Sequence, residues 1–266
     1  MQKLGQHFLK NKAALRLIIE ALDLKPQEIV IEIGPGHGEL TEEGERKMEN
    51  GEWIAIEKDH ALAEALKKQS KTNGCVKIIE SDALKFLKDG PSSILRTPYS
   101  FKLAGNIPYY ITGHLLRILS ELEHKPELCV FTIQKEVAER IIAKPPHMNR
   151  LAASVQFWAE PKILKILPAE DFSPPPKVES AIIKLANGGR RAEGGEKYYA
   201  TVRTLFAQPR KTILNNLTSA KKESGPQLKS RDYITKFLEA LKIDPSARPQ
   251  DLQIADIVSI SEALSL

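Results

Sequence analysis

Apolar positions along the first 187 residues follow two alternating spacings. Short runs of consecutive apolar residues, typical of buried strands, are separated by segments in which apolar residues recur three and four positions apart, as on one face of a helix. Strands are predicted at 29–33, 53–57, 76–79, 101–104, 129–133 and 180–186, with a further strand-like stretch at 151–167. Helices are predicted at 11–22, 40–50, 60–70, 113–122 and 135–143. This alternation predicts an α/β fold with a doubly wound sheet.

The pattern changes after residue 187. Residues 188–196 are rich in glycine and charge and have no apolar period, which indicates a linker. All later apolar spacing is helical, and helices are predicted at 197–208, 210–219, 230–241 and 250–264. The chain is therefore predicted to hold a large α/β domain at 1–187 and a small all-helical domain at 197–266.

Composition narrows the class of protein. The 266 residues are 42% hydrophobic, enough for a substantial core. No apolar run approaches the roughly 18 residues of a membrane span, and the first residues hold no apolar stretch of signal-peptide length. Cys75 and Cys129 are isolated, and the six histidines show no metal-ligand spacing. We expect a cytoplasmic protein with no membrane contact and no metal.

Charge favours a nucleic-acid partner. Lys and Arg number 39 against 34 Asp and Glu, for a net charge of +5, and basic side chains bind phosphates by displacing counterions. Basic residues gather between 203 and 230, where Glu223 is the one acid. Arg203, Arg210 and Lys211 are the candidate RNA contacts in this stretch, although a solvated helix surface is an equally good interpretation of the same pattern.

Three glycines at alternate positions follow the first predicted strand. Gly34, Gly36 and Gly38 form G-x-G-x-G, whereas a dinucleotide enzyme has G-x-G-x-x-G. Glycine allows a close approach of backbone to ligand, although a plain structural turn also uses glycines in this way. Glu32, within the strand, is expected either to orient this turn or to meet the positive end of a ligand.

Two acids at the ends of the next strands strengthen a ligand-site interpretation. Glu57 ends the second strand, where a carboxylate accepts hydrogen bonds from both ribose hydroxyls of a nucleoside. Asp82 ends the third strand, in position to accept from an adenine amino group. A single acid here would more often be a solvated loop residue, but the two at adjacent strand ends favour a nucleoside site.

The fourth strand runs into Asn106-Ile107-Pro108-Tyr109. The Asn106 side-chain oxygen and the Ile107 carbonyl can accept the two hydrogens of an exocyclic amine, while Pro108 keeps the turn rigid and donates nothing. Tyr109 offers a face on which an extruded base can stack. An ordinary asparagine–proline loop turn is the competing interpretation. Phe172, before a triple proline, either closes the pocket from the other side of the base or packs in the core.

Taken in chain order, these motifs resemble the ribosomal RNA adenine N6,N6-dimethyltransferase family of the kasugamycin-resistance type. The matching segments are 3–9, 31–36, 55–59, 81–84, 105–109, 134–137, 172–181, 206–217 and 243–245, which cover nearly the whole chain. Pro209 departs from the family, which usually has arginine there, and Ile107 replaces a leucine. With Pro209, either one phosphate contact is lost or a helix begins at that residue.

The resemblance implies a Rossmann-like class I methyltransferase domain followed by the helical domain, with S-adenosylmethionine as cofactor. Cofactor contacts carry over to His7, Leu9, Gly34, Gly36, Glu57, Asp82, Ala83 and Asn106. Base handling carries over to Asn106, Ile107, Pro108, Tyr109 and Phe172. The implied reaction is dimethylation of two adjacent adenosines in the 3′-terminal hairpin loop of small-subunit ribosomal RNA during ribosome biogenesis. The implied partner is the small ribosomal subunit. Nothing in the sequence indicates an obligate dimer, and we expect a monomer.

Two other functions stay open on the sequence. The cousins that methylate large-subunit RNA and confer macrolide resistance also carry isoleucine at the position of Ile107. A ribosome-assembly factor with secondary catalysis is the alternative from another class, although intact Glu57, Asp82 and Asn106 favour a cofactor site in use. An NAD dehydrogenase would need the other glycine spacing.

Overall fold

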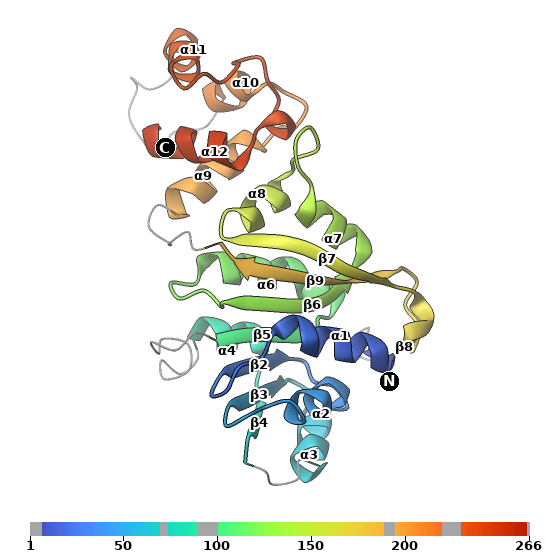
Figure 1. Cartoon of the computed structure of the whole chain (residues 1–266). Helices are drawn as coiled ribbons and strands as arrows, with labels where there is room; N and C mark the ends of the chain where they lie inside the picture. Colours follow the sequence, from blue (N-terminus) through green and yellow to red (C-terminus); the bar gives the residue numbers. More distant parts are fainter. Residues whose placement is uncertain (1–6, 70–73, 90–100, 189–194, 220–229, 265–266) are drawn as a thin grey trace. The chain divides into compact units, whose positions relative to one another are not determined.

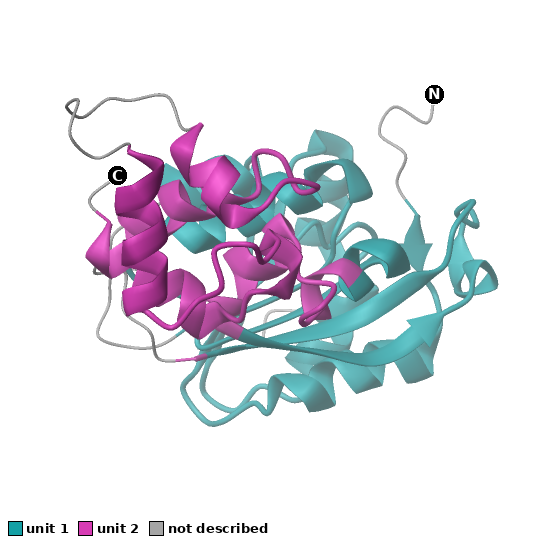
Figure 2. Ribbon diagram, turned by 90° about the horizontal axis from the view of Figure 1, so that it is seen from above, with its two compact units in different colours: residues 1–139, 160–187 teal, residues 140–159, 188–266 magenta. Residues whose placement is uncertain are grey.

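The computed structural model describes residues 7–69, 74–89, 101–188, 195–219 and 230–264. The chain forms two compact units, coloured separately in Figure 2. Unit 1 comprises residues 1–139 and 160–187, and unit 2 comprises residues 140–159 and 188–266.

Unit 1 is built on a seven-stranded sheet in the order β4-β3-β2-β5-β6-β9-β7 (Figure 1). Its strands are β2 (Ile29–Ile33), β3 (Glu52–Glu57), β4 (Val76–Glu80), β5 (Phe101–Asn106), β6 (Leu128–Gln134), β7 (Ala159–Leu167) and β9 (Ser180–Asn187). The strands from β4 to β6 are mutually parallel, and β9 runs antiparallel to β6. The chain winds outward from β2 in one direction and from β5 in the other, so a topological switch point lies between them.

Helices lie on both sides of this sheet (Figure 2). They are α1 (Lys12–Leu22), α2 (Glu39–Glu45), α3 (His60–Gln69), α4 (Ala83–Asp89), α6 (Thr112–Glu121) and α7 (Lys135–Ile142), whose last turn belongs to unit 2. Asn11 caps the N-terminus of α1, because its side chain accepts hydrogen bonds from two backbone amides of the first turn. Its buried face, which includes Ile18 and Leu22, packs in one apolar cluster with β2, β3, β5 and β6. Burial on the sheet therefore selects the helical conformation that the apolar spacing predicted.

A second, two-stranded sheet joins the start of unit 1 to a late segment of it. β1 (Phe8–Leu9) pairs antiparallel with β8 (Phe172–Ser173), which follows the short 3₁₀ helix η2 (Ala169–Asp171). Another 3₁₀ turn, η1 (Tyr109–Ile111), precedes α6. The apolar pattern did not predict the small sheet, because strands of two residues carry no period.

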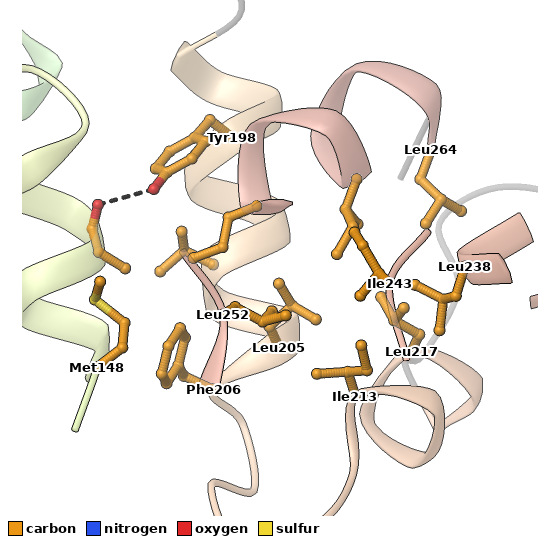
Figure 3. Packing of buried hydrophobic residues seen from close by; sticks show 14 of the residues in the cluster. Met148, Tyr198, Leu205, Phe206, Ile213, Leu217, Leu238, Ile243, Leu252 and Leu264 are labelled. Atoms are coloured by element: carbon orange, nitrogen blue, oxygen red, sulfur yellow. Dashed lines mark hydrogen bonds between the residues drawn. The ribbon is translucent and has the colours of Figure 1, made fainter. Parts of the chain in front are cut away.

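Apart from Ala159, which begins β7, the described residues of unit 2 form helices and connecting turns around their own apolar core (Figure 3). Its helices are α8 (Arg150–Gln156), α9 (Gly195–Leu205), α10 (Ile213–Thr218), α11 (Arg231–Ala240) and α12 (Ile254–Ala263), with a 3₁₀ turn η4 (Pro249–Asp251) before α12. Side chains such as Leu205, Leu238 and Ile257 are completely buried in this core. Tyr198 stacks on Phe157 with ring centroids 3.8 Å apart and donates its hydroxyl to the Ala153 carbonyl at 2.9 Å.

Three elements differ from the sequence predictions. Residues 150–156 form α8 instead of a strand, because the Asn149 side chain accepts from the backbone nitrogens of Leu151 and Ala152 and begins a helix there. α8 packs against α9, so residues 140–159 belong to unit 2, whereas the sequence assigned them to the first domain. Pro209 does not begin a helix, since α10 starts at Ile213 with Thr212 as its cap.

The fold class predicted from the sequence is confirmed: a doubly wound α/β sheet is accompanied by a small helical unit. Of the predicted linker, residues 189–194 lie outside the described residues, and Gly195 and Glu196 already belong to α9.

Candidate active site

A pocket lies at the carboxyl ends of β2, β3 and β5. Its empty volume, counted out to open solvent, is about 420 Å³. Because it lies between β2 and β5, it occupies the switch point at which doubly wound sheets bind ligands. It is lined by His7, Phe8, Gly34, Gly36, Glu57, Asn106, Ile107, Pro108 and Tyr109.

The glycine turn after β2 forms one wall of the pocket. Gly34 and Gly36 have φ angles of +66° and +62°, in the left-handed region that favours glycine. A Cβ on Gly36 would lie 2.7 Å from the ring of Phe8, whereas a Cβ on Gly34 would meet nothing within 4 Å. Gly36 therefore lets Phe8 lie against the turn, and Gly34 leaves open space for a ligand beside the backbone.

Glu57 brings a buried carboxylate to this wall, with 3% of the residue exposed. Its Oε2 accepts a hydrogen bond from the backbone nitrogen of Gly36 at 3.2 Å, and its Oε1 accepts from that of Asp59 at 2.8 Å. A carboxylate has about four acceptor positions. Glu57 is thus held in place and still has acceptor capacity for two hydroxyl groups of a ligand.

Glu32 is a second buried carboxyl, in β2, and does not line the pocket. Its Oε2 accepts from the Thr41 hydroxyl at 2.6 Å and from Trp53 Nε1 at 2.7 Å. Burial raises the pKa of Glu32 to about 7, although both hydrogen bonds oppose the rise. Of its two expected roles, the structure supports the first: Glu32 ties β2 to α2 and β3 on either side of the glycine turn.

Asp82 follows β4 and does not line the pocket. Its Oδ1 accepts from the backbone nitrogens of Leu84 and Lys85 at 2.9 and 3.3 Å, so it caps α4, which begins at Ala83. Its Oδ2 accepts from Lys58 Nζ at 2.8 Å. The bond to Lys58 is the main reason that the pKa of the Asp82 carboxyl is lowered. Asp82 is therefore an ionised carboxylate with protein partners on both oxygens.

Asn106 ends β5 and presents its carboxamide at the pocket. Its Nδ2 donates to the backbone carbonyl of His7 at 2.6 Å. The following turn is anchored by the Ile107 backbone nitrogen, which donates to the Thr132 carbonyl at 3.0 Å. Pro108 has a φ of −55° and offers no N–H. The loop thus has a fixed backbone and displays acceptors on Asn106 and Ile107.

Tyr109 is half-buried, with its hydroxyl 2.7 Å from Ser180 Oγ. Burial raises the pKa of the Tyr109 phenol, which is therefore neutral at physiological pH. The ring lies 5.9 Å from that of His7, tilted by 31°. Tyr110, the next residue, is 62% exposed. The loop therefore pairs one anchored tyrosine on the pocket wall with one at the surface.

Phe172 and Leu9 lie in the core and not in the pocket, with exposures of 1% and 3%. They are register partners in the β1–β8 sheet and belong to the apolar cluster beneath α1. A ring with so little exposed surface has no face on which a base could stack. Phe172 therefore packs as the core residue that the sequence offered as its alternative.

The candidate RNA contacts Arg203, Arg210 and Lys211 are all exposed, in unit 2. Arg203 lies on α9, and Arg210 and Lys211 lie in the turn before α10. Lys221, Lys222 and Lys229, which the sequence placed in the same basic stretch, lie outside the described residues.

Two features do not occur within the described ranges. In those ranges no group of three or more His, Cys, Asp or Glu side chains is placed to hold a metal ion. No helix among the same residues is long and apolar enough to cross a membrane.

Phe8 is the pocket residue that sequence reasoning missed. Its ring lies against Gly36 and 4.3 Å from the ring of His37. It lies between His7 and Leu9, the two residues of the N-terminal segment that were assigned to the cofactor, and a strand of two residues has no period that could have singled it out. In a strand, neighbouring side chains point to opposite faces, so Phe8 and Leu9 cannot share the pocket.

Known proteins resemble the chain along its whole length. The family model described as ribosomal RNA adenine dimethylase matches residues 1–265. The ribosomal RNA small subunit methyltransferase A of Dehalococcoides mccartyi (strain CBDB1) is 38% identical over 256 residues, which are 95% of this chain and 84% of that protein. The protein of the same name from Geobacillus kaustophilus is 33% identical over 270 residues, covering 99% of this chain and 90% of the relative.

Solved structures agree with the sequence relatives. A dimethyladenosine transferase from Plasmodium falciparum superposes with a TM-score of 0.79 at 25% identity, covering 96% of both chains. The 23S rRNA methyltransferase ErmE superposes with a TM-score of 0.73 at 23% identity, covering 97% of this chain and 100% of ErmE. The likeness to ErmE shows that the two proteins share a fold.

Proposed function

The chain belongs to the ribosomal RNA adenine dimethylase family, and on that basis we propose that it transfers methyl groups from S-adenosylmethionine to adenine N6 in small-subunit ribosomal RNA. The observation that carries the proposal is the pocket at the switch point, where the buried carboxylate of Glu57 and the carboxamide of Asn106 line the same cavity. The Glu57 carboxylate recognises a nucleoside cofactor, and the Asn106 carboxamide accepts a hydrogen bond from an amine.

The pocket fits the cofactor by its shape and its donor set. The open space beside Gly34 admits a ligand close to the backbone, and Glu57 has acceptor capacity left for two ribose hydroxyls. His7 and Phe8, at the N-terminal end of β1, also line the pocket. Asp82 and Ala83, beyond the lining, would reach the adenine end of the ligand, with Oδ2 of Asp82 shared between the ligand and Lys58. The cofactor supplies a methyl group on a sulfonium, a good leaving group.

The protein's part in the chemistry is to make the amine nitrogen available. The N6 lone pair of adenine is delocalised into the ring, and acceptors for both N6 hydrogens favour the tetrahedral nitrogen that attacks. Asn106 Oδ1 and the Ile107 carbonyl are those acceptors, held by the rigid turn at Pro108. Such contacts strengthen as positive charge develops on the nitrogen, so they stabilise the transition state more than the ground state. Tyr109 supplies the ring for stacking.

The substrate is proposed to be two adjacent adenosines in the 3′-terminal loop of small-subunit RNA. The named relatives that cover this chain almost completely are small-subunit methyltransferases, whereas the large-subunit enzyme ErmE shares the fold at lower identity. A single-stranded loop suits a site that must take a base out of its stack. Exposed Arg203, Arg210 and Lys211 would bind RNA phosphates. We propose that the enzyme acts as a monomer in the cytoplasm, on assembling small subunits.

Methyl transfer to defined substrates tests this function. The assay offers labelled S-adenosylmethionine with small subunits that lack these methyl groups, with large subunits, or with naked small-subunit RNA. The expected product is N6,N6-dimethyladenosine, on small-subunit RNA only. Label on large-subunit RNA would instead establish the resistance-type activity, and cofactor binding without transfer to any RNA would favour an assembly factor.

A further inference from the structure

We propose that the β1–β8 sheet is a positioning device for catalysis: it holds the His7 carbonyl so that the Asn106 carboxamide can face the substrate with its oxygen only. This inference rests on the proposed function, because it concerns how Asn106 accepts from the amine. It assigns a role to β1, β8 and the Asp171 side chain beyond lining the pocket or packing in the core.

The two ends of an asparagine side chain are not equivalent in this reaction. Oδ1 accepts hydrogen bonds, whereas Nδ2 donates them and would oppose the N–H groups of an adenine amine. Rotation of the amide by 180° would therefore replace the acceptor by a repelling donor. In the structure, Nδ2 donates to the His7 carbonyl at 2.6 Å, and a carbonyl oxygen can only accept. The contact thus selects one of the two orientations and leaves Oδ1 as the outward end.

The loop itself cannot make this selection. Its hydrogen bonds to the rest of the sheet fix the Ile107 backbone through Thr132 and the Tyr109 hydroxyl beside Ser180. Neither bond involves the Asn106 side chain. Among the described residues, its one hydrogen bond is the donation to His7, which lies 99 positions away in the sequence. The orientation of the catalytic amide therefore depends on where β1 lies.

β1 is held in place by hydrogen bonds between the residues that flank it and those that flank β8. His7 Nδ1 lies 2.8 Å from the Pro174 carbonyl, and the Lys10 backbone nitrogen donates to the Asp171 carbonyl at 2.9 Å. Asn11 Nδ2 donates to Asp171 Oδ1 at 2.7 Å. Between these bonds, buried Leu9 and Phe172 anchor the pair in the core of unit 1. The His7 carbonyl is thus fixed by polar contacts at both ends of the pairing and by apolar burial in its middle.

Substitution of Asp171 tests the device without removing a pocket residue. Asp171→Ala deletes the acceptor for Asn11, whereas the matched variant Asp171→Asn keeps an oxygen in that position. At saturating cofactor and RNA we expect kcat to fall about tenfold in Asp171→Ala and less than about threefold in Asp171→Asn, since small misplacements of catalytic groups are costly. Cofactor affinity should stay within about threefold of the parent in both. Full kcat in Asp171→Ala, or a loss confined to cofactor affinity, overturns the proposal.

A second variant tests the orientation even if Asp171→Ala folds poorly. Asn106→Asp keeps an acceptor oxygen toward the amine but cannot donate to His7, so we expect its kcat to fall as far as that of Asn106→Ala. If Asn106→Asp retains more than about a tenth of parental kcat, donation to His7 is dispensable and the inference fails. Full activity of Asn106→Ala would instead remove the catalytic role of Asn106, and with it the proposed mechanism. The two failures are therefore distinguishable.

Discussion

The pocket of unit 1 and the helical core of unit 2 are stabilised in different ways. Around the pocket, single polar contacts join residues far apart in the sequence, such as Asn106 to His7 and Glu57 to Gly36. The core of unit 2 is a cluster of apolar side chains contributed by short helices, including Leu205, Leu217 and Leu238 (Figure 3). At the pocket, the loss of one atom changes an orientation. In the helical core, the loss of volume leaves a cavity.

This contrast implies that activity and stability can be separated by mutation. Substitutions at the pocket should act on rate or on cofactor affinity with little effect on the free energy of unfolding. Substitutions in the helical core should do the reverse.

The largest effect is expected at Asn106. Asn106→Ala removes an acceptor that strengthens in the transition state, so kcat should fall by about 10³-fold, as for other preorganised groups of this kind. Cofactor affinity, measured by calorimetry, should stay within about threefold of the parent. Equal losses in kcat and in cofactor affinity would mean that Asn106 serves binding and not the methyl-transfer step.

In the helical core of unit 2, a substitution should lower stability and leave cofactor affinity unchanged. Leu238 is fully buried, and Leu238→Ala should lower the free energy of unfolding by about 2–5 kcal/mol, through lost burial and a residual cavity. Tyr233→Ala on the same helix is the control: Tyr233 is 47% exposed and its loss should cost no more than about 0.5 kcal/mol. Denaturant unfolding measures both. A drop in cofactor affinity for folded Leu238→Ala would break the separation of the two regions.

Glu32 sharpens the comparison because it is a titratable group within the core of unit 1. Its folded pKa of about 7 lies above the ordinary value of 4.5, so the folded state binds the proton more tightly than the unfolded state. Stability from this proton is complete below pH 4.5 and is lost as pH rises through about 7. Glu32→Gln should therefore gain stability relative to the parent over that window, by up to roughly 3 kcal/mol.

Chemical unfolding at several pH values measures the effect of Glu32→Gln. Glu20→Gln, at an exposed position of α1, is the control and should leave the pH profile unchanged. If the free energy of unfolding changed with pH in the same way for Glu32→Gln and the parent, Glu32 would not titrate in this range.

The smallest effect is expected at the surface of unit 2. Replacing Arg210 and Lys211 by alanine should leave stability unchanged and reduce the slope of log affinity for RNA against log salt by up to about 2. Filter binding across a salt series measures the slope. An unchanged slope would exclude these two side chains from phosphate contacts.

The sequence predicted the parts of the site that lie at the ends of regular strands. Buried strands with an apolar run are readable from the chain, and a parallel sheet brings Gly34, Glu57 and Asn106 to one edge. Contacts set by tertiary structure were not readable. The two-residue strands β1 and β8 have no period, and the pairing of Asp82 with Lys58 depends on how two loops meet.

Phe172 is another residue whose position depends on tertiary structure and could not be predicted from the sequence. Its motif matched the family, yet the motif alone did not distinguish a ring at the pocket from one in the core. Because β8 pairs with β1, the Phe172 ring packs in the apolar cluster.

A structure of the protein with S-adenosylmethionine bound tests the central claim most directly, because the claim concerns one pocket that serves both cofactor and base. We predict that the ribose hydroxyls lie within about 2.6–3.2 Å of the Glu57 carboxylate, that the methyl group faces Asn106, and that Nδ2 of Asn106 still donates to His7. Cofactor bound away from the switch point, or an Asn106 amide turned with its nitrogen toward the methyl group, would contradict the account.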